Sequence, residues 1–195
     1  MRIFRNANIP NNYKRSAIVI GNFDGIHKGH QEVFKKTKKF ANKKKIKFGV
    51  LTFTPLPIMF FNKKIKNFRL ISEDRKFKLF EKHGVDFIIN IRFNKKFSEI
   101  NAEKFIKKII YKKINPRLLS VSNNFKFGRK RKGDINLLKN FSYKYDYQLL
   151  NVQPFKYKGI IVSSTRIRKC LQRGNIYLAN KLLSRTWFVD GIVNK

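Results

Sequence analysis

Two histidines, His27 and His30, stand three residues apart in segment 21–30. Glycines let a backbone turn sharply and approach a ligand closely, and three of them share this segment: Gly21, Gly25 and Gly29. A pair of imidazoles at this spacing can donate hydrogen bonds to charge that develops at phosphorus. The pattern predicts a site for phosphoryl or nucleotidyl transfer, a chemistry that requires mainly positioning and charge neutralisation.

The place of segment 21–30 in the chain bears on how the histidine pair is interpreted. An apolar run precedes the segment and an amphipathic stretch follows it, so the histidines fall where a strand passes into a helix. The start of a helix presents unpaired N–H groups to an anion, and this context, with Asp24 beside the glycines, favours phosphate binding. The alternatives are a surface turn with incidental histidines and a metal site with only two ligands.

A second polar cluster, in segment 162–168, combines hydroxyl side chains with guanidinium groups. Ser163, Ser164 and Thr165 can cap the start of a helix, which is the simplest interpretation. Arg168 follows Ser164 by about one helical turn and is predicted to point toward the same place as the cap. A planar guanidinium binds phosphate in a bidentate manner, so we favour phosphate binding over capping alone.

A third segment, 121–134, leaves an apolar run, turns through asparagines and continues into a basic loop. Asn124 is its candidate contact to phosphate or to a metal ion. The alternative is a solvated loop with two phenylalanines packed beneath it. Without the other two segments, the sequence would not favour nucleotide binding over a solvated loop here.

Apolar runs that alternate with amphipathic basic stretches predict the elements that hold the three segments. Strands are predicted at 17–20, 47–53, 85–91, 118–121 and 148–152, with a final extended piece at 187–193. Helices are predicted at 30–42, 73–83, from after Asn101 to before Pro116, at 134–144, from Ser163 or Ser164 to Gly174, and at 176–183. This alternation predicts an α/β fold with a mostly parallel sheet and helices on both faces. Its ligand is expected at the loops after Ile20, Phe53 and Val121, beyond the carboxyl ends of the strands.

The charge of the chain is strongly positive. Its 195 residues include 46 Lys and Arg against 11 Asp and Glu, a formal charge of +35. Such a charge fits an anionic partner, which could be nucleic acid, a membrane surface or a polyphosphate. The lysines are scattered along the whole chain, however, and we favour a compositional bias. We therefore expect no specific nucleic-acid partner and no membrane partner, and the oligomeric state stays open.

The composition also excludes several classes of protein. The scarce carboxylates form no catalytic pair apart from the adjacent Glu73 and Asp74, which argues against glycosidase and two-metal chemistry. A single cysteine, Cys170, excludes a disulfide framework and a multi-cysteine zinc site. The apolar runs are too short to span a bilayer and the N-terminus has no apolar signal region, so a soluble, cytoplasmic protein is expected.

Together, in this order and spacing, the three segments resemble the FMN adenylyltransferase half of the prokaryotic bifunctional riboflavin kinase/FAD synthetase family. Segment 21–30 matches the family signature Gly-Asn-Phe-Asp-Gly-x-His-x-Gly-His, and segment 163–168 matches its Ser-Ser-Thr-x-Ile-Arg helix start. Segment 121–128 is similar to the family's Val-Gly-x-Asn/Asp-Phe-x-Phe-Gly loop. Similarity at 70–86 and at 175–185 extends the resemblance to about residues 15–193.

The resemblance implies a Rossmann-like nucleotidyltransferase fold that forms FAD and pyrophosphate from FMN and ATP with Mg²⁺. By motif, His27 and His30 stabilise the transition state of an in-line attack, and Asn124 helps to hold phosphate or Mg²⁺. The residues at ATP- and phosphate-binding positions are Gly21, Phe23, Asp24, Gly25, Gly29, Asn124, Ser164, Thr165 and Arg168.

Four positions depart from the family pattern. Thr54 and Leu56 replace the glutamate and histidine of the usual Thr-Phe-Glu-Pro-His-Pro strand end. Ile161 stands where arginine is usual, and Ser122 replaces a glycine. Because the loss of one transition-state contact costs about 2–4 kcal/mol, a catalytically weakened flavin- or nucleotide-binding protein of the same fold is the alternative function. A cytidylyltransferase-like enzyme with another acceptor is disfavoured by the flavin-type sequence at 21–25.

The resemblance also divides the chain. Residues 1–185 are expected to form the FMN adenylyltransferase domain, and residues 186–195 a stub of the riboflavin kinase domain. The kinase signature Gly-Arg-x-Leu-Gly-Phe-Pro-Thr-Ala-Asn is absent from the sequence. We therefore expect no riboflavin kinase activity. The chain is expected to be either a natural single-domain FMN adenylyltransferase or a truncated product.

Overall fold

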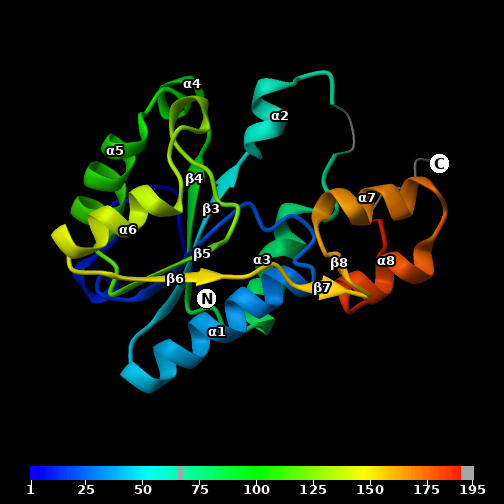
Figure 1. Ribbon diagram of the computed structural model, residues 1–195, viewed down its shortest axis with the longest axis horizontal. Coiled ribbons are helices and arrows are strands. Elements are labelled where there is room, and N and C mark those ends of the chain that lie inside the picture. Colours follow the sequence, from blue (N-terminus) through cyan, green and yellow to red (C-terminus); the bar gives the residue numbers. More distant parts are fainter. Residues whose placement is uncertain (66–67, 190–195) are drawn as a thin grey trace.

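Six parallel strands form the central sheet of the computed structural model, which describes residues 1–65 and 68–189 (Figure 1). The strands are β1 (Arg2–Phe4), β2 (Ala17–Ile20), β3 (Phe48–Thr54), β4 (Phe87–Arg92), β5 (Leu118–Ser122) and β6 (Gln148–Val152). Their order in the sheet is β1-β4-β3-β2-β5-β6. All five neighbouring pairs are parallel.

The central strands form because their sequences are continuous apolar runs. Strand β2 is buried at every position, and β3 and β4 are buried at all but their last residue. Such runs are typical of parallel strands that are covered on both faces. In the sheet, Val19 of β2 lies beside Val50 of β3 and Ser120 of β5. The carboxyl ends of these three strands therefore reach the same edge.

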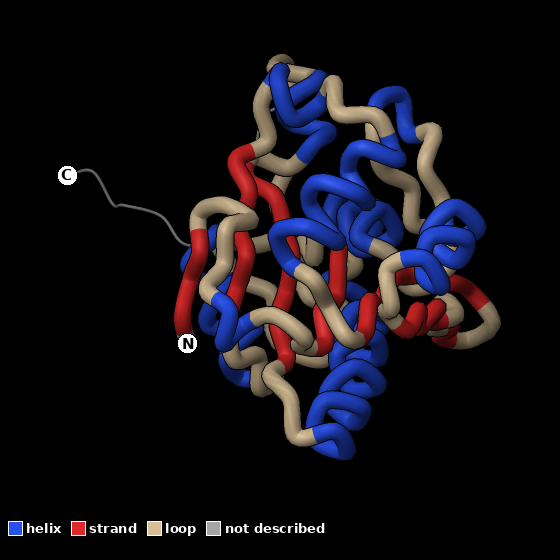
Figure 2. The backbone as a smooth tube through the Cα atoms, turned by 90° about the vertical axis from the view of Figure 1, so that its left-hand side faces the viewer, coloured by secondary structure: helices blue, strands red, loops and turns tan. Residues whose placement is uncertain are grey.

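Helices cover both faces of this sheet, as Figures 1 and 2 show. The longer helical elements are α1 (Lys28–Lys44), α3 (Glu73–Lys82), the π-helical segment η2 (Phe105–Ile114), α6 (Ile135–Lys144), α7 (Ser164–Gln172) and α8 (Ile176–Leu183). Phe34 of α1 and Phe80 of α3 are buried in one apolar cluster with Val19. Ile110 of η2 and Leu138 of α6 are buried in a second cluster. A parallel sheet thus lies between two helical layers.

Helices α7 and α8 form a third apolar cluster beside the sheet. Ile167 and Leu182 are fully buried there, together with Leu70 from the segment before α3. The remaining short elements are η1 (Asn11–Tyr13), α2 (Pro57–Phe61), α4 (Lys95–Ser98), α5 (Ala102–Lys104), η3 (Arg129–Arg131), β7 (Lys156–Tyr157) and β8 (Ile160–Ile161). Among the described residues, none of the helices combines the length and apolar character needed to cross a membrane.

The predicted fold class, a Rossmann-like α/β fold with a parallel sheet and helices on both faces, is confirmed. All five predicted strands are present, and β1, the hairpin β7–β8 and α2 are additional. The helix predicted from residue 30 begins at Lys28, because His27 is its extended N-cap residue. Of the two serines proposed as the cap of α7, Ser163 is the cap, and its Oγ accepts a hydrogen bond from Arg166 N at 3.2 Å. The extended piece predicted at 187–193 forms no strand over 187–189, and 190–193 lie outside the described residues.

Candidate functional site

The histidine segment lies where the strand order of the sheet reverses. From β2 the chain continues to β3 on one side, and it returns later to β5 on the other side of β2. The loops that leave β2 and β5 therefore diverge at neighbouring carboxyl ends and leave a crevice for a ligand. This is the edge at which the sequence predicts the site.

The backbone between β2 and α1 is strained. Phe23 and Ile26 have φ values of 52° and 39°, in the left-handed region that non-glycine residues rarely adopt. Gly25 between them has a φ of 81°, which a glycine adopts at no steric cost. Backbone strain of this kind persists only where the surroundings impose it, and it concentrates at functional sites.

His27 and His30 are stacked at the start of α1. Their ring centroids are 3.7 Å apart and their planes differ by 19°. The ring of Phe23, which is buried in the core, meets His30 edge-on with centroids 5.2 Å apart. The Nδ1 atoms of both histidines are buried without a hydrogen-bond partner among the described residues. Buried polar atoms are normally satisfied, so this pair is available to a ligand.

Both imidazoles are neutral at physiological pH. The pKa of His27 is lowered to about 4, mainly by burial and also by the nearby charge of Arg185. Burial, and then the neighbouring His27, hold the pKa of His30 well below its usual range. A neutral imidazole still carries one N–H donor, so each ring can bind phosphate oxygen without a charge of its own.

These pKa shifts predict that the protein loses stability in mild acid. In the unfolded chain His27 takes up a proton below pH about 6.5, but in the folded chain only below about 4. The free energy of unfolding therefore falls as the pH falls between these values, by about 3 kcal/mol for His27 alone. His30 adds to this loss, whereas Asp24, whose pKa is raised mainly by burial, opposes it. Urea titrations between pH 7 and pH 4.5 measure the effect.

The control for the acid effect is His27→Gln, which removes one of the three histidines whose pKa burial lowers. Its free energy of unfolding should depend less steeply on pH than that of the unsubstituted protein. Equal slopes for the two proteins would show that His27 is not the group that titrates.

The hydroxyl cluster at the start of α7 lies against the histidine loop. Ser164 Oγ donates a 2.8 Å hydrogen bond to the carbonyl oxygen of Asp24. A Cβ atom placed on Gly29 would lie 3.4 Å from the carbonyl oxygen of Val162 and 3.1 Å from His27 Cε1. The structure thus brings together two segments that are 140 residues apart in sequence.

The tight space at Gly29 yields a second prediction. A Gly29→Ala substitution favours the helix, so the melting temperature should stay unchanged or rise slightly. The new methyl group must displace the His27 ring by a few tenths of an ångström. Because small misplacements are costly in catalysis, we expect turnover to fall about tenfold. Asn42→Ala, on the exposed far end of α1, is the matched control. Full activity in Gly29→Ala would contradict the proposed ring position.

Asp24 and Arg168 form a buried ion pair beneath the loop. The Arg168 Nη2 atom donates to Asp24 Oδ2, and the two side chains are 18% and 6% exposed. Arg168 Nε also donates to the carbonyl oxygen of Phe68 at 2.8 Å, and Leu70 N donates to Asp24 Oδ1 at 2.9 Å. The pair therefore joins three parts of the chain: the histidine loop, α7 and the segment that precedes α3.

Two residues that hold the histidine loop in place, Arg185 and Gln31, were not predicted from the sequence. The Arg185 guanidinium donates to the carbonyl oxygens of Gly25 at 2.6 Å and Ile26 at 3.5 Å. Gln31 Nε2 also donates to the Ile26 carbonyl, at 2.9 Å. No motif marks Arg185, and only its place just after α8 could have drawn attention to it.

The other predicted residues are placed as follows. Gly21 directly follows β2, and the exposed Thr165 is the second residue of α7. Asn124 is exposed in the loop after β5, and its Oδ1 accepts a 3.2 Å hydrogen bond from Ser122 Oγ. Among the described residues, Asn124 makes no side-chain hydrogen bond to the histidine loop. Arg166 does not face the loop, since its Nη1 donates to the Ile160 carbonyl oxygen at 2.8 Å and so holds the hairpin β7–β8.

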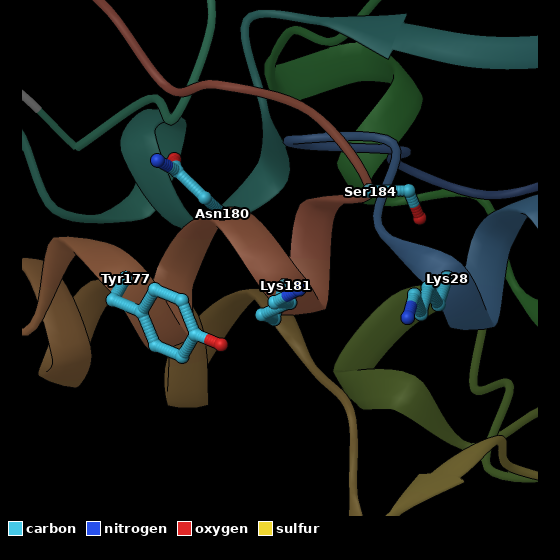
Figure 3. A pocket seen from close by; sticks show the side chains of 5 residues that line it. All are labelled: Lys28, Tyr177, Asn180, Lys181 and Ser184. Carbon is cyan, nitrogen blue, oxygen red and sulfur yellow. The ribbon is translucent and has the colours of Figure 1, made fainter.

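The structure has two further surface features of interest. An aromatic cluster (Phe60, Phe61, Phe93 and Phe97) lies around α2 and the end of β4, with Phe61 69% exposed. A cavity of about 350 Å³ opens beside the start of α1, where Lys28 lies opposite α8, as Figure 3 shows. Its lining residues are Lys28, Tyr177, Asn180, Lys181 and Ser184.

Comparison with known sequences gives concordant matches. Residues 9–166 match the family model described as FAD synthetase. A bifunctional riboflavin kinase/FMN adenylyltransferase from Buchnera aphidicola subsp. Schizaphis graminum is 41% identical over 179 residues, 91% of this chain and 57% of that protein. A Listeria monocytogenes FAD synthetase is 29% identical, and the match covers 94% of this chain and 75% of that protein. The chain thus spans little more than half the length of the bifunctional relatives that it matches.

Solved structures agree on the fold. A crystal structure described as a macrolide-efflux protein from Streptococcus pneumoniae has a TM-score of 0.81 and 28% identity, covering 94% of this chain and 59% of that one. A pantoate-beta-alanine ligase from Francisella tularensis has a TM-score of 0.56 at 15% identity, covering 94% of this chain and 78% of that one. The second likeness shows the fold alone.

Proposed function

Because the chain belongs to the FAD synthetase family, we propose that it transfers the adenylyl group of ATP to FMN and releases pyrophosphate. The observation that carries this proposal is the stacked pair of His27 and His30, whose free Nδ1 atoms lie at the start of α1 and at the switch point of the sheet. Helix starts and switch points of α/β sheets both favour phosphate ligands.

In the proposed reaction, an oxygen of the FMN phosphate attacks the α-phosphorus of ATP in line. A new P–O bond forms there as the bond to the bridging oxygen breaks, and pyrophosphate takes the electron pair of that bond. The imidazole N–H groups of His27 and His30 stabilise the negative charge on the equatorial oxygens. The FMN phosphate is already an anion at neutral pH, so it supplies the attacking oxygen without a general base from the protein.

We assign Ser164 and Thr165 to the ATP phosphates, together with the backbone N–H groups at the start of α7. Ser164 already fixes the position of this helix start against the histidine loop. Arg168 holds the same junction through Asp24 and Phe68, so its two donors to them act as positioning contacts.

Mg²⁺ would enter with ATP. The described residues contain no group of three His, Cys, Asp or Glu side chains that could hold a metal ion by itself. Mg²⁺ sites of this type use substrate phosphates for most of their ligands, and an amide oxygen such as Asn124 Oδ1 is a fitting protein ligand. The ion would neutralise phosphate charge, and Asn124, exposed at the end of β5, would orient it.

The aromatic cluster is the proposed contact for the flavin ring. Phe60 and Phe61 each lie against Phe93, with ring centroids 5.4 and 5.8 Å apart. A half-exposed set of aromatic rings provides a planar apolar surface for a ligand that is itself planar and aromatic. Its place at the carboxyl end of β4 puts it on the same edge of the sheet as the histidines.

The decisive experiment incubates the purified protein with FMN, ATP and Mg²⁺ and follows FAD by chromatography. We expect FAD and pyrophosphate in equal amounts, and no FAD when ATP is omitted. Binding of FMN and ATP without FAD from folded protein would instead support a nucleotide-binding protein whose site is weakened at Thr54, Leu56 and Ile161.

A further inference from the structure

Arg69, which lies just before α3, carries an unsatisfied donor. Its Nε is buried and has no hydrogen-bond partner in the part of the chain that the structure describes. Its Nη1 lies 3.8 Å from Glu73 Oε2, which is too far for a hydrogen bond. The side chain is 30% exposed, so a ligand from solvent can reach the guanidinium.

A second cation, Lys76, is buried close by on α3. Its ammonium group has three N–H donors, and it donates to Thr52 Oγ1 at 3.4 Å. The pKa of Lys76 is lowered to about 8, mainly by burial; the charge of Arg69 contributes to this decrease, whereas the carboxylates of Glu73 and Asp24 oppose it. Two positive side chains thus repel each other in a poorly hydrated place.

The neighbouring carboxylates compensate this positive charge only in part. Glu73 accepts hydrogen bonds from Thr54 Oγ1 at 2.6 Å and Asn90 Nδ2 at 3.2 Å, and it pairs with Arg5 at 3.3 Å. Asp24 is committed to Arg168 and to Leu70 N. One glutamate therefore faces three cations, and buried positive charge of this kind is stabilised by an anion.

Two hydrogen bonds connect this cationic group to the histidine loop. Thr52 Oγ1, which accepts from Lys76, donates to the carbonyl oxygen of Asn22 at 3.3 Å. Leu70 N, next to Arg69, donates to Asp24 Oδ1 at 2.9 Å. Arg69 and Lys76 therefore lie near the carboxyl ends of β2 and β3. In the sheet, β3 lies between β2, which leads to the histidines, and β4, which leads to the aromatic cluster.

We propose that Arg69 and Lys76 form the subsite for the phosphate monoester of FMN, the acceptor of the adenylyl group. This inference rests on the proposed function and names the two residues that would hold the attacking group. A guanidinium fork and an ammonium suit a phosphate dianion. The proposed donors to the triphosphate are different groups, the two histidines and the start of α7.

Flavin fluorescence titrations, without ATP and without turnover, test this subsite. Comparing FMN with riboflavin isolates the phosphate, because the two ligands share the same ring. The unsubstituted protein should bind FMN more tightly than riboflavin. In Arg69→Gln and in Lys76→Met, the Kd for FMN should rise about 10- to 100-fold, as expected for lost hydrogen bonds to a charged group. The Kd for riboflavin should stay within about twofold of its original value.

Three controls separate the alternatives. Arg173→Gln removes an exposed arginine of α7 and should change neither Kd. Arg69→Lys retains the charge and should restore part of the preference for FMN. Calorimetry should show an unchanged Kd for ATP in Arg69→Gln, and melting curves should show that each variant is folded.

Several outcomes would overturn the inference. Equal weakening of FMN and riboflavin in Arg69→Gln would assign the residue a structural role, and weakened ATP binding would assign it to the triphosphate. An unsubstituted protein that binds FMN and riboflavin equally would contradict the subsite even if FAD is formed. Conversely, a phosphate-dependent preference without FAD formation would uphold the subsite and reject the proposed activity.

Discussion

His27→Ala and His30→Ala are each expected to lower kcat for FAD formation by about 100- to 1,000-fold. This is the usual cost of removing one donor that stabilises transition-state charge. The two rings stack with centroids 3.7 Å apart, so they form one unit. The double variant should therefore lose little more than the more damaging single variant, because effects of residues that act together are not additive.

The matched control for the histidine variants is His83→Ala. His83 ends α3 and lies on the other side of the apolar core, with its ring packed against Phe34. His27→Asn provides a second comparison, because it retains an N–H donor and should keep more activity than His27→Ala. Steady-state FAD formation at saturating FMN and ATP measures each effect. Folded histidine variants that retain more than about a tenth of the activity would contradict the catalytic assignment.

The second large effect concerns stability. Asp24→Ala and Arg168→Ala are each expected to lower the free energy of unfolding by about 3–5 kcal/mol, because each leaves an uncompensated charge in a buried place. The Asp24 side chain is 6% exposed, and burial already raises its pKa despite the nearby charge of Arg168. The double variant removes both charges and should lose clearly less than the sum of the single variants.

Urea unfolding of the four proteins in this cycle gives the coupling energy of the pair. Arg168→Lys adds a further comparison, because it keeps the charge but loses the hydrogen bond to the Phe68 carbonyl oxygen and the stacking of the guanidinium carbon 3.6 Å from the Phe68 ring centroid. Single variants that lose less than about 1 kcal/mol would show that solvent reaches the pair and screens it.

Sequence patterns predicted the parts of the fold that long apolar runs encode. Strands such as β2 and β3 are buried on both faces, and such runs stand out against a lysine-rich background. Strand β1 has only three residues, and only pairing with β4, more than 80 residues later, makes it a strand. The hairpin β7–β8 has two residues in each strand, and Arg166 holds it from outside. Tertiary contacts stabilise both, and a local pattern does not record them.

For the candidate site, as for the fold, local sequence patterns predicted the main segments but not the tertiary contacts between them. Sequence analysis singled out the histidines and the serine–threonine cluster, and the structure places them side by side. The spacing of Arg168 from Ser164 and its guanidinium group predicted a phosphate contact, but its ion pair with Asp24 depends on how α7 packs and has no local pattern. The burial of Lys76 could not be predicted from the sequence either, because a lysine on a helix is usually solvated.

The anchoring of the histidine loop by Arg185 has a consequence for how the protein is made. The bond from Arg185 to the Gly25 carbonyl oxygen spans 160 residues, so a nascent chain carries both histidines long before it carries the group that fixes their loop. The family match ends at residue 166, before α8 and this arginine are reached. On the ribosome, the sheet around β2–β4 can therefore assemble early, whereas the loop gains its final shape only after Arg185 has been synthesised.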